Sequence, residues 1–437
     1  MIHIKSEKLF AGAGKAEIRF REEMLPIEGF RGIHDHPAAR VLLLRCGEQV
    51  AIACLELVML PPDGIDTVKR AISEITGTRP EHIWVHTTHA ITTPHAPHAP
   101  MGMGGVLLEI SEEEKKTLEY KLGLYMEALL EAVTEATEGA AGAFRRACMG
   151  VGTGECRVNV NRDVRTPHGW WIGFAPEEPS NHRATVLRFE DEQGGLIAVL
   201  LSYGIKPCAI DNSEMDRGNR LISSDVPGLA CRLLEERFGA PCLFAMSAAG
   251  DQVPLRQAWY DVVEEDGSIR KVDLGVQEGL KIVDELGRQM AREAAAIVEG
   301  TVCGRDAPAI RLAEGHMEWP GKVRTKMELT HQAVYRREGS QRVDVQVITL
   351  GDTALVGLKP EINTPTEARL QAASPYALTL VVSMVNGGQK YMPDARAYEN
   401  STWEAQSAPL MPGAAEKWVE EAVKLLDKTR EGEGESD

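Results

Sequence analysis

Short apolar runs, each of the length of a β-strand, recur along the whole chain. Several are apolar at both odd and even positions, which is typical of strands covered on both faces of a sheet. In one run Asp344 and Gln346 alternate with valines, so we expect one wetter face on that strand. The runs cover residues 40–46, 50–60, 82–86, 196–205, 242–247, 343–350, 353–358 and 378–385.

Between these runs lie segments in which apolar residues recur every three or four positions, the spacing of an amphipathic helix. The longest, 111–138, opens with Ser111 and Glu114 in the spacing of a capping box. The others are residues 63–76, 226–238, 275–298 and 413–428. Because strands and helices alternate, the pattern predicts an α/β fold.

Turn signals at 192–195 and at 266–267 predict hairpins, so the sheet should be mixed rather than purely parallel. We find no internal repeat and no flexible linker in the pattern. The prediction is therefore a single large domain over residues 1–430, with a mixed β-sheet flanked by helices and a site at the carboxyl ends of strands. Residues 431–437, EGEGESD, are predicted to be a disordered tail.

Charge narrows the classes of partner. The chain has 48 Lys and Arg against 65 Asp and Glu, a net charge of −17, which argues against nucleic acid and anionic membranes as partners. No apolar run approaches the length of a membrane span, and the first residues lack a secretory pattern. Eight cysteines occur without a CxxC pair. We therefore expect a cytoplasmic protein with reduced, buried thiols, and the sequence predicts no particular oligomeric state.

Polar side chains follow the ends of five different apolar runs: His89, Lys206, Asp251, Glu361 and Tyr391. Since ligands of α/β proteins bind beyond the carboxyl ends of strands, we expect these side chains to line one pocket. Nitrogen and oxygen donors of this kind suit Zn²⁺ or a similar divalent ion.

The same side chains also have ordinary structural interpretations. His86, within a strand, fits a packed core histidine better than a ligand. Glu361 can form a surface ion pair, and Asp251 can cap a helix or a turn. Lys206 ends a very apolar strand, where a buried lysine needs a partner or a lowered pKa.

Several segments, in order along nearly the whole chain, resemble the N-terminal domain of the neutral/alkaline (non-lysosomal) ceramidase family. The segment THAITTP at 88–94 resembles the family's THTHSGP, and FAMSAAGDQVP at 244–254 resembles FAQSNAGDVSP. The remaining matches are AGAGKAEI at 11–18, NVNR at 159–162, ISSDVPG at 222–228, GLKPE at 357–361, YMP at 391–393 and YE at 398–399. The family's C-terminal immunoglobulin-like domain has no counterpart in these 437 residues.

The resemblance implies a zinc-dependent amide hydrolase. It places His89, Glu361 and Tyr391 as zinc ligands and Arg162 as the arginine that polarises the substrate. His86 and Tyr398 are candidates for substrate contacts.

Three positions depart from the family pattern: Lys206 replaces the second zinc histidine, Ile91 the second histidine of THTH, and Val253 a serine held to be catalytic. Lys206 can be explained in three ways. It can be carbamylated and bind the metal, act as a neutral base or Schiff-base nucleophile, or replace the metal's charge by pairing with Glu361. Electrostatics favours the third explanation slightly.

The leading functional hypothesis is a hydrolase of an amide or lactone-like bond in a small polar substrate, assisted by zinc. Arg162 would stabilise the developing oxyanion, while Lys206 and Asp251 would complete the catalytic site or anchor a substrate carboxylate. One alternative is a metal-free lyase or isomerase in which Lys206 is the base. The other is a non-catalytic protein that binds a small molecule. A long-chain lipid substrate is less expected, because no membrane-docking segment is evident.

Overall fold

The structure, a computed structural model, describes residues 8–98, 109–211, 220–304, 309–323 and 326–431. The predicted tail at 431–437 lies outside these residues except for Glu431, which ends helix α8 (Ala414–Glu431). In the described part of the chain, every helix is too short or too polar to cross a bilayer.

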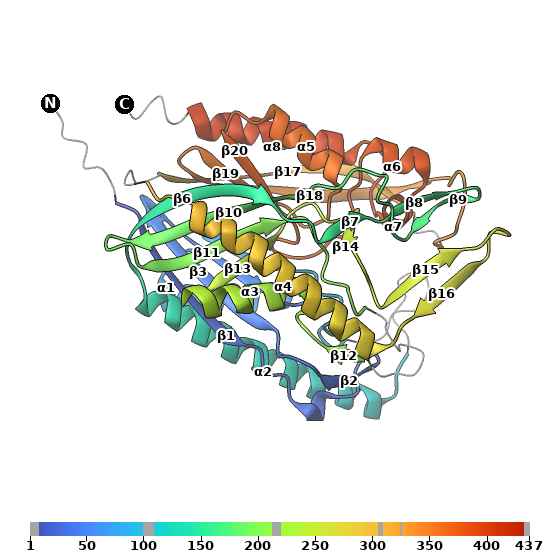
Figure 1. Cartoon of the computed structure of the whole chain (residues 1–437), viewed down its shortest axis with the longest axis horizontal. Coiled ribbons are helices and arrows are strands. Elements are labelled where there is room, and N and C mark those ends of the chain that lie inside the picture. The colour runs from blue at the N-terminus through green and yellow to red at the C-terminus, as the bar shows by residue number, and fades with distance from the viewer. Residues whose placement is uncertain (1–7, 99–108, 212–219, 305–308, 324–325, 432–437) are drawn as a thin grey trace.

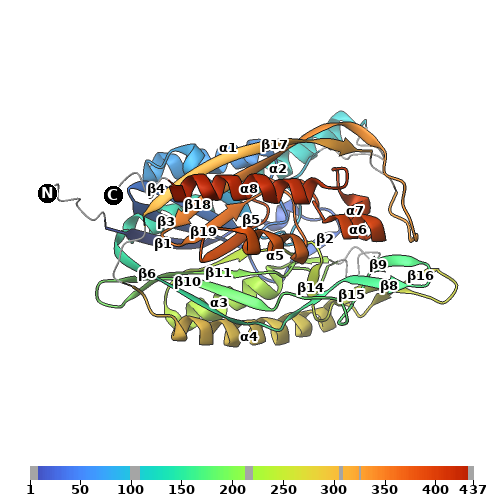
Figure 2. The same ribbon diagram turned by 90° about the horizontal axis from the view of Figure 1, so that it is seen from above.

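Four layers build the fold: helices, an eight-stranded sheet, a four-stranded sheet and further helices (Figures 1 and 2). In spatial order the large sheet contains β13 (Cys242–Met246), β11 (Leu196–Tyr203), β10 (Arg183–Asp191), β6 (Arg145–Glu155), β1 (Phe10–Glu17), β3 (Ala38–Cys46), β4 (Glu48–Leu55) and β5 (Ile83–Thr87). The small sheet contains β17 (Ile310–Lys322), β18 (Arg337–Leu350), β19 (Thr353–Gly357) and β20 (Leu378–Val382). One apolar core fills the space between the sheets.

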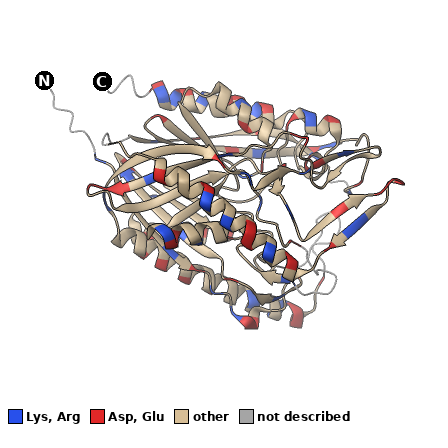
Figure 3. Ribbon diagram, viewed as in Figure 1, with Lys and Arg blue, Asp and Glu red and all other residues tan. Residues whose placement is uncertain are grey.

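Helices cover the two outer faces. On the large sheet, α1 (Pro62–Thr76) and α2 (Glu112–Gly142) cover the β1–β3–β4–β5 half, and α3 (Asp225–Phe238) and α4 (Val276–Gly300) cover the other half. The small sheet packs its outer face on α5 (Thr364–Ala373) and α8. Charged residues recur along the outer helices and on the β15–β16 hairpin (Figure 3).

The α/β class and the mixed sheet are confirmed. Strands pair antiparallel except for β4–β5, β11–β13 and β19–β20 in the two main sheets, which are parallel. The predicted runs and helices appear with shifts of a few residues, and Ser111 caps α2 through the expected capping box. Both predicted hairpins form, between β10 and β11 and between β15 (Trp259–Val263) and β16 (Ile269–Asp273). The division of the strands into two stacked sheets was not predicted.

The glycines of the segment AGAGKAEI have a packing role. They lie in β1, where a Cβ on Gly12 would be 2.2 Å from the Ala140 carbonyl oxygen and one on Gly14 would be 2.0 Å from that of Ala136. Both carbonyls belong to α2. The two glycines therefore let α2 lie directly on the sheet.

Short elements gather at one end of the layers and complete the site. They are β2 (Phe30–Ile33) with β12 (Arg220–Ile222), β7 (Asn159–Asn161) with β14 (Gln252–Pro254), β8 (Asp163–Thr166) with β9 (Gly169–Ile172), and the helices α6 (Ala395–Asn400) and α7 (Trp403–Ser407). Strands β7, β8 and β14 and helices α6 and α7 lie beyond the carboxyl ends of β11 and β13 (Figure 1).

Candidate active site

Four of the predicted side chains come together in one buried cluster, each from a segment that follows a core strand. The Glu361 carboxylate is central. Its Oε1 accepts a hydrogen bond from His89 Nδ1, and its Oε2 forms an ion pair with Lys206 Nζ at 2.8 Å. Lys206 Nζ also donates to the Tyr391 hydroxyl at 2.7 Å. The segments after β5, β11, β19 and β20 thus meet at one point, as the rule for strand ends predicts.

Backbone pairing holds Glu361 next to Tyr391. The Glu361 amide donates to the Lys390 carbonyl at 2.7 Å, and the Met392 amide donates to the Glu361 carbonyl at 2.8 Å. These two bonds form a short parallel bridge beyond β19 and β20. The carboxylate and the phenol are therefore positioned by main chain rather than by long flexible side chains.

His89 lies in a tight loop at the end of β5. Its φ of 55° is in the left-handed region, which is rare for residues other than glycine and clusters at functional sites. The neighbouring amides of Thr88 and Ala90 donate to the Leu55 and Leu57 carbonyls at 3.0 and 3.2 Å. The loop is thus bound to the chain leaving β4, which fixes the direction of the imidazole.

The charges of the cluster follow from these contacts. Burial alone would raise the pKa of Glu361, but His89 and Lys206 outweigh it and lower the pKa to about 2. Burial and Arg162 would lower the pKa of Lys206, but Glu361 and Tyr391 outweigh them, so that pKa is raised. Lys206 is therefore an ammonium and Glu361 a carboxylate. Since a carboxylate only accepts, His89 Nδ1 carries the shared hydrogen, and in the neutral imidazole Nε2 is the acceptor nitrogen.

His89 is the most exposed member of the cluster, and Tyr391 is 9% exposed. The side chain of His89 is 17% exposed, whereas those of Lys206 and Glu361 are 1% and 0% exposed. Two hollows of about 460 and 710 Å³ among the described residues are lined by other side chains. A ligand would therefore approach this cluster past the imidazole.

The residues present do not fit the predicted zinc ion. Lys206 Nζ already lies between the Glu361 carboxylate and the Tyr391 hydroxyl, where a metal bridging the two would lie. The third predicted ligand, His89, uses its Nδ1 on the same carboxylate. An ammonium at this point repels a divalent ion and occupies its ligands. The contacts agree with the explanation in which Lys206 replaces the metal's charge.

Replacing Lys206 with histidine is expected to create a zinc site. Lys206→His removes the cation and adds a fourth neutral or anionic donor to His89, Glu361 and Tyr391, the number that zinc prefers. Calorimetric titration of chelator-treated protein should show about one additional equivalent of Zn²⁺. Cys148 and Cys303 should be replaced by serine in the parent and in Lys206→His, because these two thiols belong to a separate group that could hold a metal ion.

The added Zn²⁺ equivalent should disappear when Glu361→Gln is combined with Lys206→His. A surface change, Lys281→His, serves as the matched control and should add no equivalent. Equal zinc binding by the parent and by Lys206→His would contradict our account of the ammonium.

Arg162 lies against the Tyr391 ring. Its Cζ is 5.3 Å from the ring centroid, and its guanidinium pairs with the buried Glu404 of α7, with Nε donating at 2.6 Å. Burial and Glu404 raise the pKa of the neighbouring Asp163. Glu404 and Asp163 were not predicted: Asp163 follows the NVNR segment directly, but no pattern marks Glu404.

Asp251 supports Arg162 and does not join the central cluster. Its Oδ1 accepts from the amide and the hydroxyl of Thr364, both at 3.0 Å, at the first residue of α5. Its carbonyl accepts from the Arg162 amide at 3.0 Å. Burial raises the pKa of Asp251 to about 7. Asp251 thus caps a helix distant in sequence, and its contacts indicate a positioning role.

The two candidates for substrate contact have their polar atoms occupied by backbone. His86 is fully buried, with Nδ1 2.7 Å from the Ser383 carbonyl oxygen and Nε2 accepting from the Met246 amide at 3.1 Å. Burial lowers its pKa to about 4, so that it is neutral. The Tyr398 hydroxyl donates to the Leu410 carbonyl at 2.7 Å. Neither contact pattern supports a substrate role, because the buried groups are already satisfied.

Two of the departures from the family pattern lie in one apolar cluster beside Lys206. Val253 and Ile91 pack with Val160, Cys208 and Phe174. The Ile91 amide donates to the carbonyl of Pro207, the residue after Lys206, at 3.2 Å. The substitutions therefore exchange polar groups for an apolar wall next to the ammonium.

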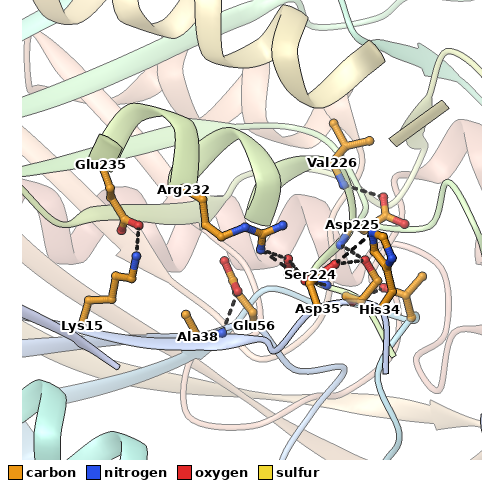
Figure 4. Close-up of polar contacts among 12 residues, drawn as sticks. Lys15, His34, Asp35, Ala38, Glu56, Ser224, Asp225, Val226, Arg232 and Glu235 are labelled. Atoms are coloured by element: carbon orange, nitrogen blue, oxygen red, sulfur yellow. Dashed lines mark hydrogen bonds and ion pairs between the residues drawn. The ribbon is translucent and has the colours of Figure 1, made fainter. Parts of the chain in front are cut away.

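The loop after Lys206 is anchored by the segment ISSDVPG. The Asp225 carboxylate accepts from the amides of Ala209 and Ile210 at 3.1 and 3.3 Å. Next to it, Ser224 and Arg232 both contact Asp35 (Figure 4). Through this part-buried polar network the ISSDVPG segment supports the loop after Lys206.

Comparisons with known proteins bear on the fold. No protein-family model and no curated protein matches the sequence. Among solved structures, a ceramidase complexed with C2 superposes with a TM-score of 0.73 at 15% identity, covering 97% of this chain and 76% of that one. Neutral ceramidase from Pseudomonas aeruginosa gives 0.72 at 16% identity, covering 97% and 75%. The fold expected from the sequence resemblance is therefore confirmed.

Proposed function

We propose that the chain is a hydrolase of an amide or ester-type bond in a small polar substrate, and that it works without a metal at the Glu361 cluster. The observation that carries the proposal is the contact between His89 and ionised Glu361, which leaves Nε2 as an oriented base at the exposed side of the cluster. The ceramidase-like fold supports hydrolysis of this class of bond.

His89 is the residue that moves the proton. Its Nε2 accepts a proton from a water molecule as that water attacks the carbonyl carbon of the substrate. The Glu361 carboxylate stabilises the imidazolium that forms, and Nε2 then returns the proton to the leaving nitrogen or oxygen. This division of labour requires the direct Nδ1 contact with Glu361.

Tyr391 and Arg162 are placed to stabilise the negative charge that develops on the carbonyl oxygen. The phenol oxygen accepts a hydrogen bond from Lys206, so its own hydrogen remains available to donate. Arg162 lies against the same ring and adds a fixed positive charge. Donors that are already oriented in a buried site stabilise a transition state without reorganising.

The closed cluster favours a small substrate. Lys206 and Arg162 each pair with a carboxylate, so the net charge that a substrate meets is low. The alternative in which Lys206 is the base needs a neutral amine, and its raised pKa opposes this. The remaining alternative, a non-catalytic binding protein, differs from the hydrolase in that it would bind a substrate without turnover.

A panel of p-nitrophenyl esters, short N-acyl amides and lactones tests the proposal. Purified protein should hydrolyse at least one member, and its kcat/KM should be unchanged after treatment with a chelator, because Lys206 provides the charge that a metal would supply. Loss of activity on chelation with recovery on adding Zn²⁺ would instead indicate a metal enzyme. Saturable binding of panel members without turnover would identify a binder.

A further inference from the structure

A second cluster of ligating side chains lies far from the Glu361 cluster. Cys148 of β6, Glu190 of β10 and Cys303 after α4 each offer one ligand atom, and these three atoms all lie within 4.8 Å of one another. Strands β6 and β10 pair Glu190 with Cys148 at one end and Arg183 with Glu155 at the other. The chain continues from Glu155 towards Arg162, so the second cluster is at the opposite end of β10 from the candidate active site.

The segment that carries Cys303 is held against β6. The Gly304 amide donates to the Met149 carbonyl at 3.0 Å. A Cβ on Gly150 would lie 2.5 Å from the Val302 carbonyl oxygen, so only glycine allows this close approach. From β10, Arg188 Nη1 donates to the Val298 carbonyl at 2.6 Å. A main-chain contact from β6 and a side-chain contact from β10 thus fix the position of the segment that carries Cys303.

We propose that Cys148, Glu190 and Cys303 form a binding site for a soft divalent metal ion such as Zn²⁺. Two thiolates and one carboxylate are ligands that zinc prefers, and zinc–ligand bonds of about 2.0–2.3 Å need only small shifts from the present separations. A fourth position remains for water.

The surroundings suit an ion with two positive charges. Glu190 Oε1 pairs with Arg188, which leaves Oε2 for the metal. Two thiolates and a carboxylate balance the charge of the ion together with that of Arg188. Cys148 and Cys303 are half-buried, whereas the other six cysteines are buried. These two thiols therefore combine access from solvent with a fixed geometry.

Zn²⁺ and Co²⁺ titrations of the full chain test this site. The protein should be purified without a histidine tag, stripped with a chelator and kept under a reductant that does not bind metal. Wild type is expected to bind one equivalent of Zn²⁺, and Co²⁺ should give a thiolate charge-transfer band in the near ultraviolet. Cys148→Ser and Cys303→Ser should each abolish the band, and Glu190→Gln should weaken binding about tenfold or more.

Matched controls separate this cluster from incidental binding. Cys156→Ala removes a buried thiol, and Glu192→Gln removes an exposed carboxylate of the same hairpin; both should bind like wild type. A wild type without the Co²⁺ band, or unchanged affinity in Cys148→Ser, would overturn the proposal. So would a Cys148–Cys303 disulfide recovered from a glutathione buffer of cytosolic potential containing Zn²⁺, which would assign the pair to redox chemistry.

Discussion

Replacing Lys206 with methionine is expected to lower the free energy of unfolding by about 3–5 kcal/mol, the cost of breaking a buried ion pair by removing one partner. Lys206 and Glu361 are 1% and 0% exposed, so water cannot replace the lost ammonium. In the variant the Glu361 carboxylate stays buried. Among the described residues, His89 is then the one side chain that still pairs with it. Urea unfolding followed by circular dichroism measures the change.

Two further variants isolate the ion pair. Lys281→Met changes a lysine that is 69% exposed and paired within one helix, and it should alter stability by less than about 0.5 kcal/mol. Adding Glu361→Gln to Lys206→Met removes the unpaired charge and should restore part of the loss. A cost below about 1 kcal/mol for Lys206→Met alone would contradict the pairing.

Lowering the pH should reduce the difference in unfolding free energy between wild type and Lys206→Met. The pKa of Glu361 lies at about 2 in the folded protein against an ordinary value of 4.5. A lowered pKa means that the ionised group stabilises the fold above about pH 4.5, and that this contribution is lost as the pH falls towards 2. The stability gap between wild type and Lys206→Met is therefore expected to narrow across this range.

Replacing His89 with alanine is expected to lower kcat/KM by about 10²–10⁴, the usual contribution of a general base. The variant removes Nε2, while Glu361 keeps its ion pair with Lys206, so the thermal unfolding midpoint should change far less than in Lys206→Met. Steady-state rates on the best substrate of the panel provide the measurement.

The matched control is His331→Ala, an exposed histidine outside the cluster, which should leave kcat/KM unchanged. Glu361→Gln should reduce kcat/KM as well, because a neutral amide no longer stabilises the imidazolium. If His89→Ala retained wild-type kcat/KM on every substrate, His89 would not be the base, whatever the identity of the bond that is cleaved.

The fold class could be predicted from the sequence because it depends on local patterns. Buried strands are apolar at most positions, helices repeat their apolar residues every three or four, and the Ser111 capping box depends on four neighbouring residues. The convergence of His89, Lys206, Glu361 and Tyr391 also followed from a local feature, the ends of strands, combined with a general rule about sheets.

Tertiary structure alone decided what these residues do to one another. Whether Lys206 is a base, a carbamylated ligand or a counter-ion depends on its 2.8 Å contact with Glu361, 155 positions away in the chain. Glu404 beside Arg162 and the cluster of Cys148, Glu190 and Cys303 likewise join distant segments. Periodicity reports which face of an element is buried, but a charge or a ligand set is defined by distances between elements, and those exist only in the folded chain.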